Sequence, residues 1–484
     1  MSYTVAQNTS FLTFASVLQK VISFVYFTII ARVIGVENTG QYFFAISFTT
    51  IFAVVADFGL VPVLTREASK FPDQSEGYVN TILWTKIVFG CAAYGLLIVA
   101  VNLLNYDPAL RELIYLSGVT MFFDSLQGTF FSIFRAHKNL VYESIGVVAS
   151  QFITLVIGTI AIVNHASLLW LIAAYTIPSF GNTLYGAYFG ARAYGLHYRF
   201  TFNFVICKAF VALAVPFALA GIIGRLYAYT DSILMSKLLP PEHLGWWSVP
   251  YKITFAFQFI PSAVAASVYP VMSSLSLTDP AKIGELFTKA WRYLFAIIFP
   301  LSFGLGAVAK PVIVALYGER FLPSVPVLRL LLVSLIFSYL GYITGALLNA
   351  TNHQKVQTSL LAVALGINTA LNLLLLPRFG IEGAALTALM SNSILCISGF
   401  YFARRFASIN INAISVAFFK TVLPAAIMAV VVWLLTLKLH FVITIPLGVA
   451  LYGGLLFWNG TIDRALLASV IAKIWYKKNY PANL

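Results

Sequence analysis

Long apolar runs alternate with short polar breaks along the whole chain. Each run holds about 20 residues or more, which is the length that an α-helix needs to cross a bilayer. The breaks contain glycine, proline and asparagine residues that end helices, as in residues 35–40, 72–77 and 377–380. This pattern predicts an all-α integral membrane protein with about fourteen transmembrane helices, over residues 9–34, 41–64, 79–104, 113–134, 141–163, 167–190, 206–239, 244–272, 291–317, 324–349, 356–376, 381–403, 416–437 and 441–460.

The composition agrees with a membrane protein and leaves no room for a large soluble domain. Of the 484 residues, 60% are hydrophobic and 10% are charged, whereas a soluble domain carries about 25% charged residues. The mean hydropathy is +0.89. Fourteen helices with short connections use the whole chain, because 484 residues leave about 35 for each crossing.

The basic residues gather on one side of this predicted topology. Connections after even-numbered helices, together with the C-terminal tail, hold 18 of the 30 lysine and arginine residues, and the other connections hold 8. Because basic loops stay in the cytoplasm, this bias predicts that both termini are cytoplasmic. It also explains the net charge of +14 without a nucleic-acid partner.

The sequence contains none of the motifs that indicate catalysis, a metal site or a cofactor. Its three cysteines, Cys91, Cys207 and Cys396, lie in or beside apolar runs, and its six histidines are scattered. No Gly-Lys dipeptide occurs, so the chain lacks a Walker-type phosphate loop and is not expected to pump with ATP. We therefore expect no catalytic residue, no metal and no cofactor.

The longest connection predicted on the cytoplasmic side covers residues 273–290. It places Ile283, Leu286 and Phe287 on one side of a short amphipathic helix. Two interpretations are open: an interfacial linker between two halves of a helix bundle, or a surface loop.

An internal repeat appears when the sequence is shifted by 205 residues. The stretch ARVIGVENTGQYF, from Ala31, then aligns with SKLLPPEHLGWWS, from Ser236, and Lys20 aligns with Arg225. Within the two stretches the matched positions form a basic, an acidic, a glycine and an aromatic pair: Arg32 with Lys237, Glu37 with Glu242, Gly40 with Gly245, and Tyr42 with Trp247.

The shift carries the first predicted helix onto the seventh, so both copies have the same orientation in the membrane. Such parallel repeats are typical of transporters that bind substrate between two halves and rock them to give alternating access. We predict a six-helix N-lobe over residues 1–205 and a pseudo-symmetric C-lobe over residues 206–406. Helices 13 and 14 and a basic cytoplasmic tail would follow over residues 407–484.

The stretches ARVIGVENTGQYFFAI, ADFGLVPVLTREASK and ILMSKLLPPEHLGWWSVPYKI resemble bacterial polysaccharide-transporter proteins. These are the Wzx-type flippases of O-antigen, capsule and exopolysaccharide assembly, in the superfamily that includes MATE exporters and the lipid II flippase. The resemblance covers roughly the first twelve predicted helices. It implies a two-lobed bundle in the bacterial inner membrane, with a central cavity through which undecaprenyl-pyrophosphate-linked oligosaccharide is flipped.

Two basic residues, Lys20 and Arg225, lie near the middle of predicted helices at equivalent positions of the repeat. A charge at the bilayer centre costs about 2.5–3.5 kcal/mol, so it is expected to face a cavity or a partner. Two such cations would attract an anion such as pyrophosphate, which arginine binds through two hydrogen bonds. We predict that both residues bind substrate, and the alternative is that each pairs with a buried aspartate.

Five further charged residues lie within predicted helices but closer to their ends or on other helices. Lys252 and Lys86 are predicted substrate-binding residues, unless their ammonium groups reach the membrane interface. Asp57, Asp124 and Asp231 are predicted ion-coupling residues, because a carboxylate within the membrane can carry a proton or a sodium ion across. The alternative is that these aspartates only neutralise the cations.

Two other functions compete with a flippase. A MATE-like exporter of organic cations needs a net acidic cavity, whereas the seven candidate residues named above are four basic and three acidic residues. A membrane glycosyltransferase or polymerase of the same pathway needs a large extracytoplasmic loop, and the loops here are short. We therefore predict a transporter rather than an enzyme. Its expected partners are the lipid-linked oligosaccharide, the membrane and the pathway's polymerase and glycosyltransferases, and a monomer is expected because the repeat supplies both halves.

Overall fold

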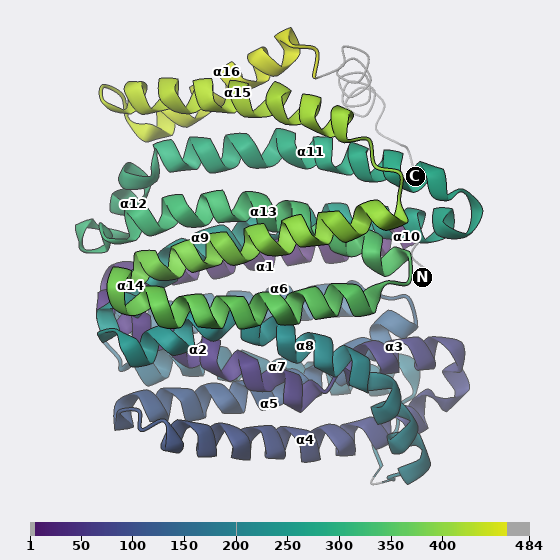
Figure 1. The fold of residues 1–484 in the computed structure, drawn as a ribbon. Coiled ribbons are helices and arrows are strands. Elements are labelled where there is room, and N and C mark those ends of the chain that lie inside the picture. Colours follow the sequence, from purple (N-terminus) through teal and green to yellow (C-terminus); the bar gives the residue numbers. More distant parts are fainter. Residues whose placement is uncertain (1–4, 200, 462–484) are drawn as a thin grey trace, which may run out of the picture. The chain divides into compact units, whose positions relative to one another are not determined.

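The computed structural model describes residues 5–199 and 201–461, and all regular elements in these ranges are helices (Figure 1). In chain order they are α1 Val5–Ile34, α2 Val36–Asp57, α3 Leu60–Lys70, η1 Pro72–Gln74, α4 Ser75–Leu103, α5 Pro108–Ala136, α6 Val141–Val163, α7 Leu168–Tyr194, α8 Phe204–Leu238, α9 Pro241–Phe257, α10 Phe259–Thr278, α11 Pro280–Ala307, α12 Ala309–Tyr317, η2 Glu319–Phe321, α13 Ser324–Ala350, α14 Gln354–Phe406, α15 Ile411–Thr436 and α16 Phe441–Trp458.

The predicted all-α architecture of fourteen helices is confirmed, although three of them are broken and two are joined. The expected helices over residues 41–64, 244–272 and 291–317 are the pairs α2 with α3, α9 with α10, and α11 with α12. The expected helices over residues 356–376 and 381–403 are the two parts of α14, which meet at a kink at Gly380 (φ 55°, ψ −138°). Each remaining expected helix corresponds to one observed helix.

The break between α2 and α3 depends on a glycine in the left-handed region of backbone conformation. Phe58 and Gly59 have φ values of 48° and 70°. Glycine adopts such positive φ values freely, whereas residues with a side chain adopt them at a cost. A Cβ atom on Gly59 would lie 2.8 Å from the Cβ of Phe217 in α8, so the close approach of α8 also requires glycine. The chain therefore changes direction here against a neighbouring helix.

Eleven helices or helix pairs in the described part of the chain are long and apolar enough to cross a membrane. The kinked α14 counts once among them, although each of its parts matches a predicted span. The helices α5 and α7 are not among the eleven. Both contribute polar side chains to the cavity described below. The eleven apolar helices show that the protein is a multi-pass membrane protein.

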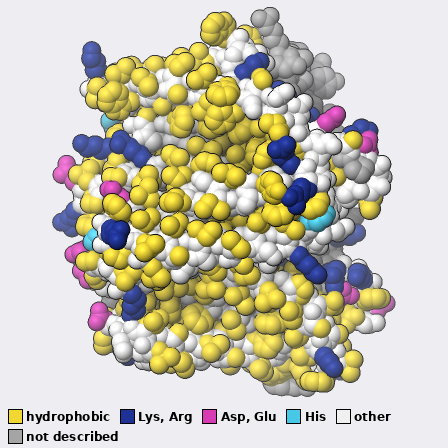
Figure 2. All heavy atoms as spheres, in the orientation of Figure 1, with side chains coloured by type: hydrophobic (Ala, Val, Ile, Leu, Met, Phe, Trp, Pro, Cys, Tyr) yellow, Lys and Arg dark blue, Asp and Glu magenta, His cyan; other side chains and the backbone are white. Residues whose placement is uncertain are grey.

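The surface of the helices agrees with this assignment. Figure 2 shows hydrophobic side chains over most of the visible face, with lysine and arginine side chains lying toward the two ends of the helices. Apolar residues such as Ile160 and Val163 of α6 are exposed. In a bilayer such side chains face lipid, and the basic residues near the helix ends lie at the two interfaces.

The described residues form two compact units. One consists of the chain up to Ala256 together with residues 361–384, and the other consists of residues 257–360 together with the chain from Ala385. In the first unit α5 packs on α7, α1 on α6 and α2 on α8. In the second unit α15 packs on α11 and α16 on α15 (Figure 1), and the ring of Phe418 lies 5.2 Å from that of Phe299. The division into lobes at residues 205 and 406 describes the repeat and stays a prediction.

Of the two interpretations of the connection over residues 273–290, the surface loop is wrong, because these residues are helical apart from Asp279, and the interfacial linker stays a prediction. The turn between α10 and α11 is the single residue Asp279, and α11 then runs without a break from Pro280 to Ala307. The side chains of Ile283 and Phe287 are buried. A Cβ atom on Gly284 would lie 2.0 Å from the carbonyl oxygen of Ser408, so this part of α11 packs closely on the chain before α15. The apolar side of this amphipathic helix is therefore buried against protein.

Candidate functional site

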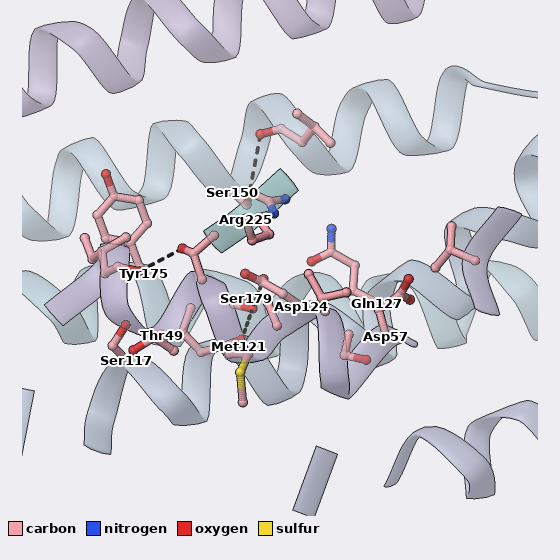
Figure 3. A pocket seen from close by; sticks show the side chains of 18 of the residues that line it. Thr49, Asp57, Ser117, Met121, Asp124, Gln127, Ser150, Tyr175, Ser179 and Arg225 are labelled. Atoms are coloured by element: carbon pink, nitrogen blue, oxygen red, sulfur yellow. Dashed lines mark hydrogen bonds between the residues drawn. The ribbon is translucent and has the colours of Figure 1, made fainter. Parts of the chain in front are cut away.

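The first compact unit encloses a cavity of about 910 Å³, shown in Figure 3. Its walls come from α1, α2, α3, α5, α6, α7, α8 and α9, and most of its polar lining residues are uncharged. A volume near the upper end of the usual range of about 300–1,000 Å³ accommodates a sizeable organic ligand. The cavity is therefore the candidate site.

Two cations line this cavity without a counterion. Arg225 of α8 exposes its side chain to the cavity and forms no ion pair or hydrogen bond with any described residue. Lys252 of α9 has its Nζ 5.4 Å from the ring centroid of Phe27, and it likewise has no acidic partner in the described ranges. Unpaired cations in a cavity at membrane depth favour an anionic ligand, because an isolated charge there is costly.

A third cation, Lys86 of α4, lies behind the wall instead of in the cavity. Its Nζ lies 2.6 Å from the Oδ1 of Asp57 and donates a 2.8 Å hydrogen bond to the carbonyl oxygen of Ser125. The Lys86 side chain is completely buried, so it does not extend to the membrane interface, whereas Asp57 is 31% exposed and lines the cavity. This lysine thus joins α4 to α2 and α5, and its positive charge is offset by Asp57.

The fourth predicted cation, Lys20, is half-buried and is not among the residues that line the cavity. Its neighbours Gln19 and Ser23 do line it. These two residues are four positions apart and share one face of α1, whereas Lys20 points about 100° away from Gln19 around the helix. The structure therefore brings Arg225 to this cavity without its repeat equivalent.

Asp124 of α5 is the lining acid that has no cation beside it. Its Oδ1 accepts a short hydrogen bond from the hydroxyl of Ser179 in α7, and the rest of its side chain is exposed to the cavity (Figure 3). No basic side chain of the described residues forms an ion pair with it. The carboxylate therefore keeps acceptor capacity for a ligand.

Asp231 of α8 lies outside this cavity, in a buried cluster of polar side chains. Its Oδ1 accepts a 2.5 Å hydrogen bond from the Nδ2 of Asn372 in α14. The same Nδ2 lies 3.0 Å from the carbonyl oxygen and 3.1 Å from the Oδ1 of Asn368, one turn earlier in α14. All three side chains are buried, and the Oδ1 of Asn372 has no hydrogen-bond donor among the described residues.

The sequence analysis named none of the uncharged polar residues of the cavity. They lie on five helices of the first unit, α1, α2, α5, α6 and α7: Gln19, Ser23, Thr49, Thr50, Ser117, Thr120, Ser125, Gln127, Ser150, Gln151, Thr154, Tyr175 and Ser179. The spacing of these residues could have predicted that they line a cavity. Ser117, Thr120 and Asp124 are three and four residues apart along α5, which places them on one face of the helix. Polar stripes of this kind within apolar spans indicate the helix face that lines a cavity.

Comparison with known proteins shows the family to which the chain belongs. A family model described as "Polysaccharide biosynthesis protein" matches residues 5–276. The chain belongs to the polysaccharide biosynthesis protein family. The resemblance to polysaccharide transporters in the sequence is thereby confirmed, and the match includes every helix that lines the cavity.

A curated relative of this polysaccharide biosynthesis protein is the teichuronic acid biosynthesis protein TuaB of Bacillus subtilis (strain 168). The two are 26% identical over 62% of this chain and 62% of TuaB. The match thus spans less than two thirds of that relative.

Two solved structures share the fold of this family member. The lipid II flippase MurJ matches with a TM-score of 0.77 at 16% identity, over 94% of this chain and 99% of MurJ. A multidrug resistance MATE family transporter in an inward-facing conformation matches with a TM-score of 0.67 at 14% identity, over 80% of this chain and 94% of that one. At these identities the likeness concerns the fold.

Proposed function

We propose that this protein is a flippase that moves an oligosaccharide linked to undecaprenyl pyrophosphate across the bacterial inner membrane. Both termini would lie in the cytoplasm, as the distribution of basic residues indicates. The observation that carries the proposal is the pair of uncompensated cations, Arg225 and Lys252, in a cavity whose other walls are mostly uncharged and polar. The family and the name of the lipid II flippase with the same fold support it.

The chemistry of the cavity fits the head group of such a lipid. A pyrophosphate that links a lipid to a sugar carries two negative charges, and the guanidinium of Arg225 can bind phosphate oxygens through two parallel hydrogen bonds. Lys252 supplies a second positive charge from α9. The lipid tail would remain in the bilayer, and only the pyrophosphate and sugars would pass through the cavity. No bond is made or broken, so the protein acts as a transporter and not as an enzyme.

The other two predicted cations take different positions in this proposal. Lys86 would act through Asp57, by holding the end of α2 at the cavity wall, and would not contact the substrate. Lys20 stays a predicted substrate-binding residue, since α1 contributes Gln19 and Ser23 to the wall beside it. The parallel repeat supports alternating access by movement of its halves, and a monomer suffices because both halves lie in one chain.

Coupling to an ion gradient belongs to the same proposal. Asp231, Asn368 and Asn372 form a buried set of oxygen-rich side chains. No described basic residue forms an ion pair with Asp231. Such a set can take up a proton or a sodium ion and release it when the helices move. Asp124 and Asp57 remain further candidates, and Asp57 is the least suited because Lys86 already offsets its charge.

A MATE-like exporter of organic cations is the second candidate, because the fold of a MATE transporter matches and Asp124 lines the cavity. The balance of charges argues against it. Two uncompensated cations and one uncompensated acid line the cavity, so an organic cation would meet net repulsion.

The deciding experiment measures flipping of a lipid-linked pyrophosphoryl oligosaccharide in proteoliposomes that contain wild type, Arg225→Ala or Lys20→Ala. Arg378→Ala serves as the control, because Arg378 is exposed and lies outside the cavity lining. We expect wild type and the control to flip the lipid and Arg225→Ala to be at least about tenfold slower, the change that about 1.4 kcal/mol produces. Absence of flipping by wild type together with export of the cationic dye ethidium would favour the exporter.

A further inference from the structure

The charges of the cavity are divided between its walls. The cationic side chains that lack a counterion, Arg225 and Lys252, both come from α8 and α9. The walls from α1, α5, α6 and α7 present hydroxyl and amide groups and a single acid, Asp124. This polar wall is defined by Gln19, Ser23, Ser117, Thr120, Asp124, Gln127, Ser150, Gln151, Thr154, Tyr175 and Ser179.

Two groups of the polar wall have hydrogen-bonding capacity left. Asp124 accepts one hydrogen bond from Ser179 and otherwise faces open space (Figure 3). The side chain of Gln151 lines the same wall and offers an amide oxygen and an amide nitrogen.

These groups match a carbohydrate better than the other parts of a lipid-linked molecule. Sugar hydroxyls donate and accept hydrogen bonds, and adjacent hydroxyls can both donate to one carboxylate such as Asp124. Amides such as Gln127 and Gln151 can donate to sugar oxygens and accept from hydroxyls, and the ring of Tyr175 offers an apolar face to a sugar ring. A lipid chain would leave all of these groups without partners, and a phosphate would be repelled by Asp124.

A count of the lining charges limits which sugar can lie there. The pyrophosphate diester of the proposed function carries two negative charges, and Arg225 and Lys252 supply two positive charges. Lys86 and Asp57 offset each other. An acidic sugar on the polar wall would therefore bring its carboxylate next to Asp124 with no described lining cation left to compensate it.

We propose that the polar wall is a subsite for an uncharged sugar residue of the substrate, with Asp124 as the acceptor for its hydroxyl groups. Acidic sugars are disfavoured at this subsite by repulsion from the same carboxylate. This inference rests on the proposed flippase function, and it names the sugar class that the cavity selects.

The test compares two synthetic polyprenyl-pyrophosphate disaccharides that differ only in one sugar, a neutral hexose or the corresponding hexuronic acid. Flipping of each is measured in proteoliposomes with wild type, Asp124→Asn and Ser179→Ala. We expect wild type to flip the neutral substrate at least about tenfold faster than the acidic one. Asp124→Asn should reduce this ratio to about threefold or less by removing the repelling charge, mainly through faster flipping of the acidic substrate. Ser179→Ala, which keeps that charge, should preserve the preference.

The failure of this subsite can be distinguished from the failure of the flippase function. If wild type flips neither substrate, the proposed function is wrong. If wild type flips both at similar rates, or if Asp124→Asn leaves the ratio unchanged, the subsite is overturned and the flippase function stands. A thermal unfolding midpoint in detergent close to that of wild type verifies that Asp124→Asn is folded. If Asp124→Asn does not fold, Asp124→Ser replaces it, and the wild-type ratio alone still decides for or against the preference.

Discussion

Gly40 and Gly245, which occupy equivalent positions of the repeat, lie against each other where α2 and α9 begin. A Cβ atom on Gly40 would lie 2.7 Å from the backbone nitrogen of Gly245 and 2.9 Å from the carbonyl oxygen of Pro241. A Cβ atom on Gly245 would lie 2.0 Å from the carbonyl oxygen of Val36. The shift of 205 residues that relates the glycines also carries Val36 onto Pro241, so the contact is reciprocal. Reciprocal contacts of this kind arise at a two-fold axis.

This glycine contact lies at one end of the cavity. Gly40 precedes Ile46, the first residue of α2 in the cavity lining, by nearly two helical turns. Tyr42 and Trp247, another repeat-related pair, are buried beside it. A side chain larger than hydrogen at either glycine must separate α2 from α9, and would therefore favour a conformation in which this end is open.

We expect Gly245→Val to expose residues that the glycine contact buries. Ser248, about one turn after Gly245 in α9, is completely buried, and its hydroxyl donates to the carbonyl oxygen of Gly245. In a background without the three native cysteines, Ser248→Cys should react slowly with a thiol reagent. Adding Gly245→Val should raise the rate by at least about tenfold, since about 1.4 kcal/mol of shifted equilibrium gives that factor.

The matched control for this prediction is Gly95→Val in α4, because a Cβ at Gly95 has no neighbouring atom within 4 Å. The control should leave the labelling rate of Ser248→Cys unchanged. Equal rates for Gly245→Val and its parent would show that the glycine contact does not hold this end of the cavity closed.

The guanidinium of Arg225 should matter for its shape as well as for its charge. Arg225→Lys retains the positive charge but loses the planar pair of donors, so it should recover only part of the flipping that Arg225→Ala loses. We expect an order of wild type, Arg225→Lys and Arg225→Ala, with about tenfold between the extremes. Competition by sugar-free polyprenyl pyrophosphate measures the same order in binding. Full activity of Arg225→Lys would mean that charge alone is recognised.

The helices were predictable from the sequence because a span of about 20 apolar residues is specified locally. The breaks were less so: Gly59 lies within an apolar stretch, and its role depends on the approach of α8, which is a tertiary contact. The same applies to Lys86, whose distance from the helix end suggested the interface, whereas its Nζ lies beside Asp57. Arg225 could be predicted as a site residue because a charged residue stands out in an apolar run. Gln151 could not, because an uncharged amide in such a run does not stand out.

The ion pair of Lys86 and Asp57 gives a prediction about stability. Lys86→Met leaves Asp57 at the cavity wall without its cation, and breaking such a buried pair typically costs about 3–5 kcal/mol. Because Asp57 is partly exposed, a cost near the lower end of that range is expected. Thermal unfolding in detergent measures the loss. The double variant Lys86→Met with Asp57→Asn should recover much of it, since no uncompensated charge remains. Equal losses in the single and the double variant would contradict the pairing.

The buried cluster around Asp231 gives a prediction about energy coupling. Asp231→Asn removes the charge while keeping the shape and the contact with Asn372, so the protein should still fold. If Asp231 carries the coupling ion, an imposed proton or sodium gradient should accelerate flipping by wild type and have little effect on this variant. Flipping without a gradient should persist in both. Asp279→Asn is the matched control, because Asp279 lies between α10 and α11 and pairs with Lys282 outside the cluster. A gradient response that survives in Asp231→Asn would overturn this role for Asp231 and leave Asp124 and Asp57 as the candidates, with the corresponding substitutions tested in the same assay.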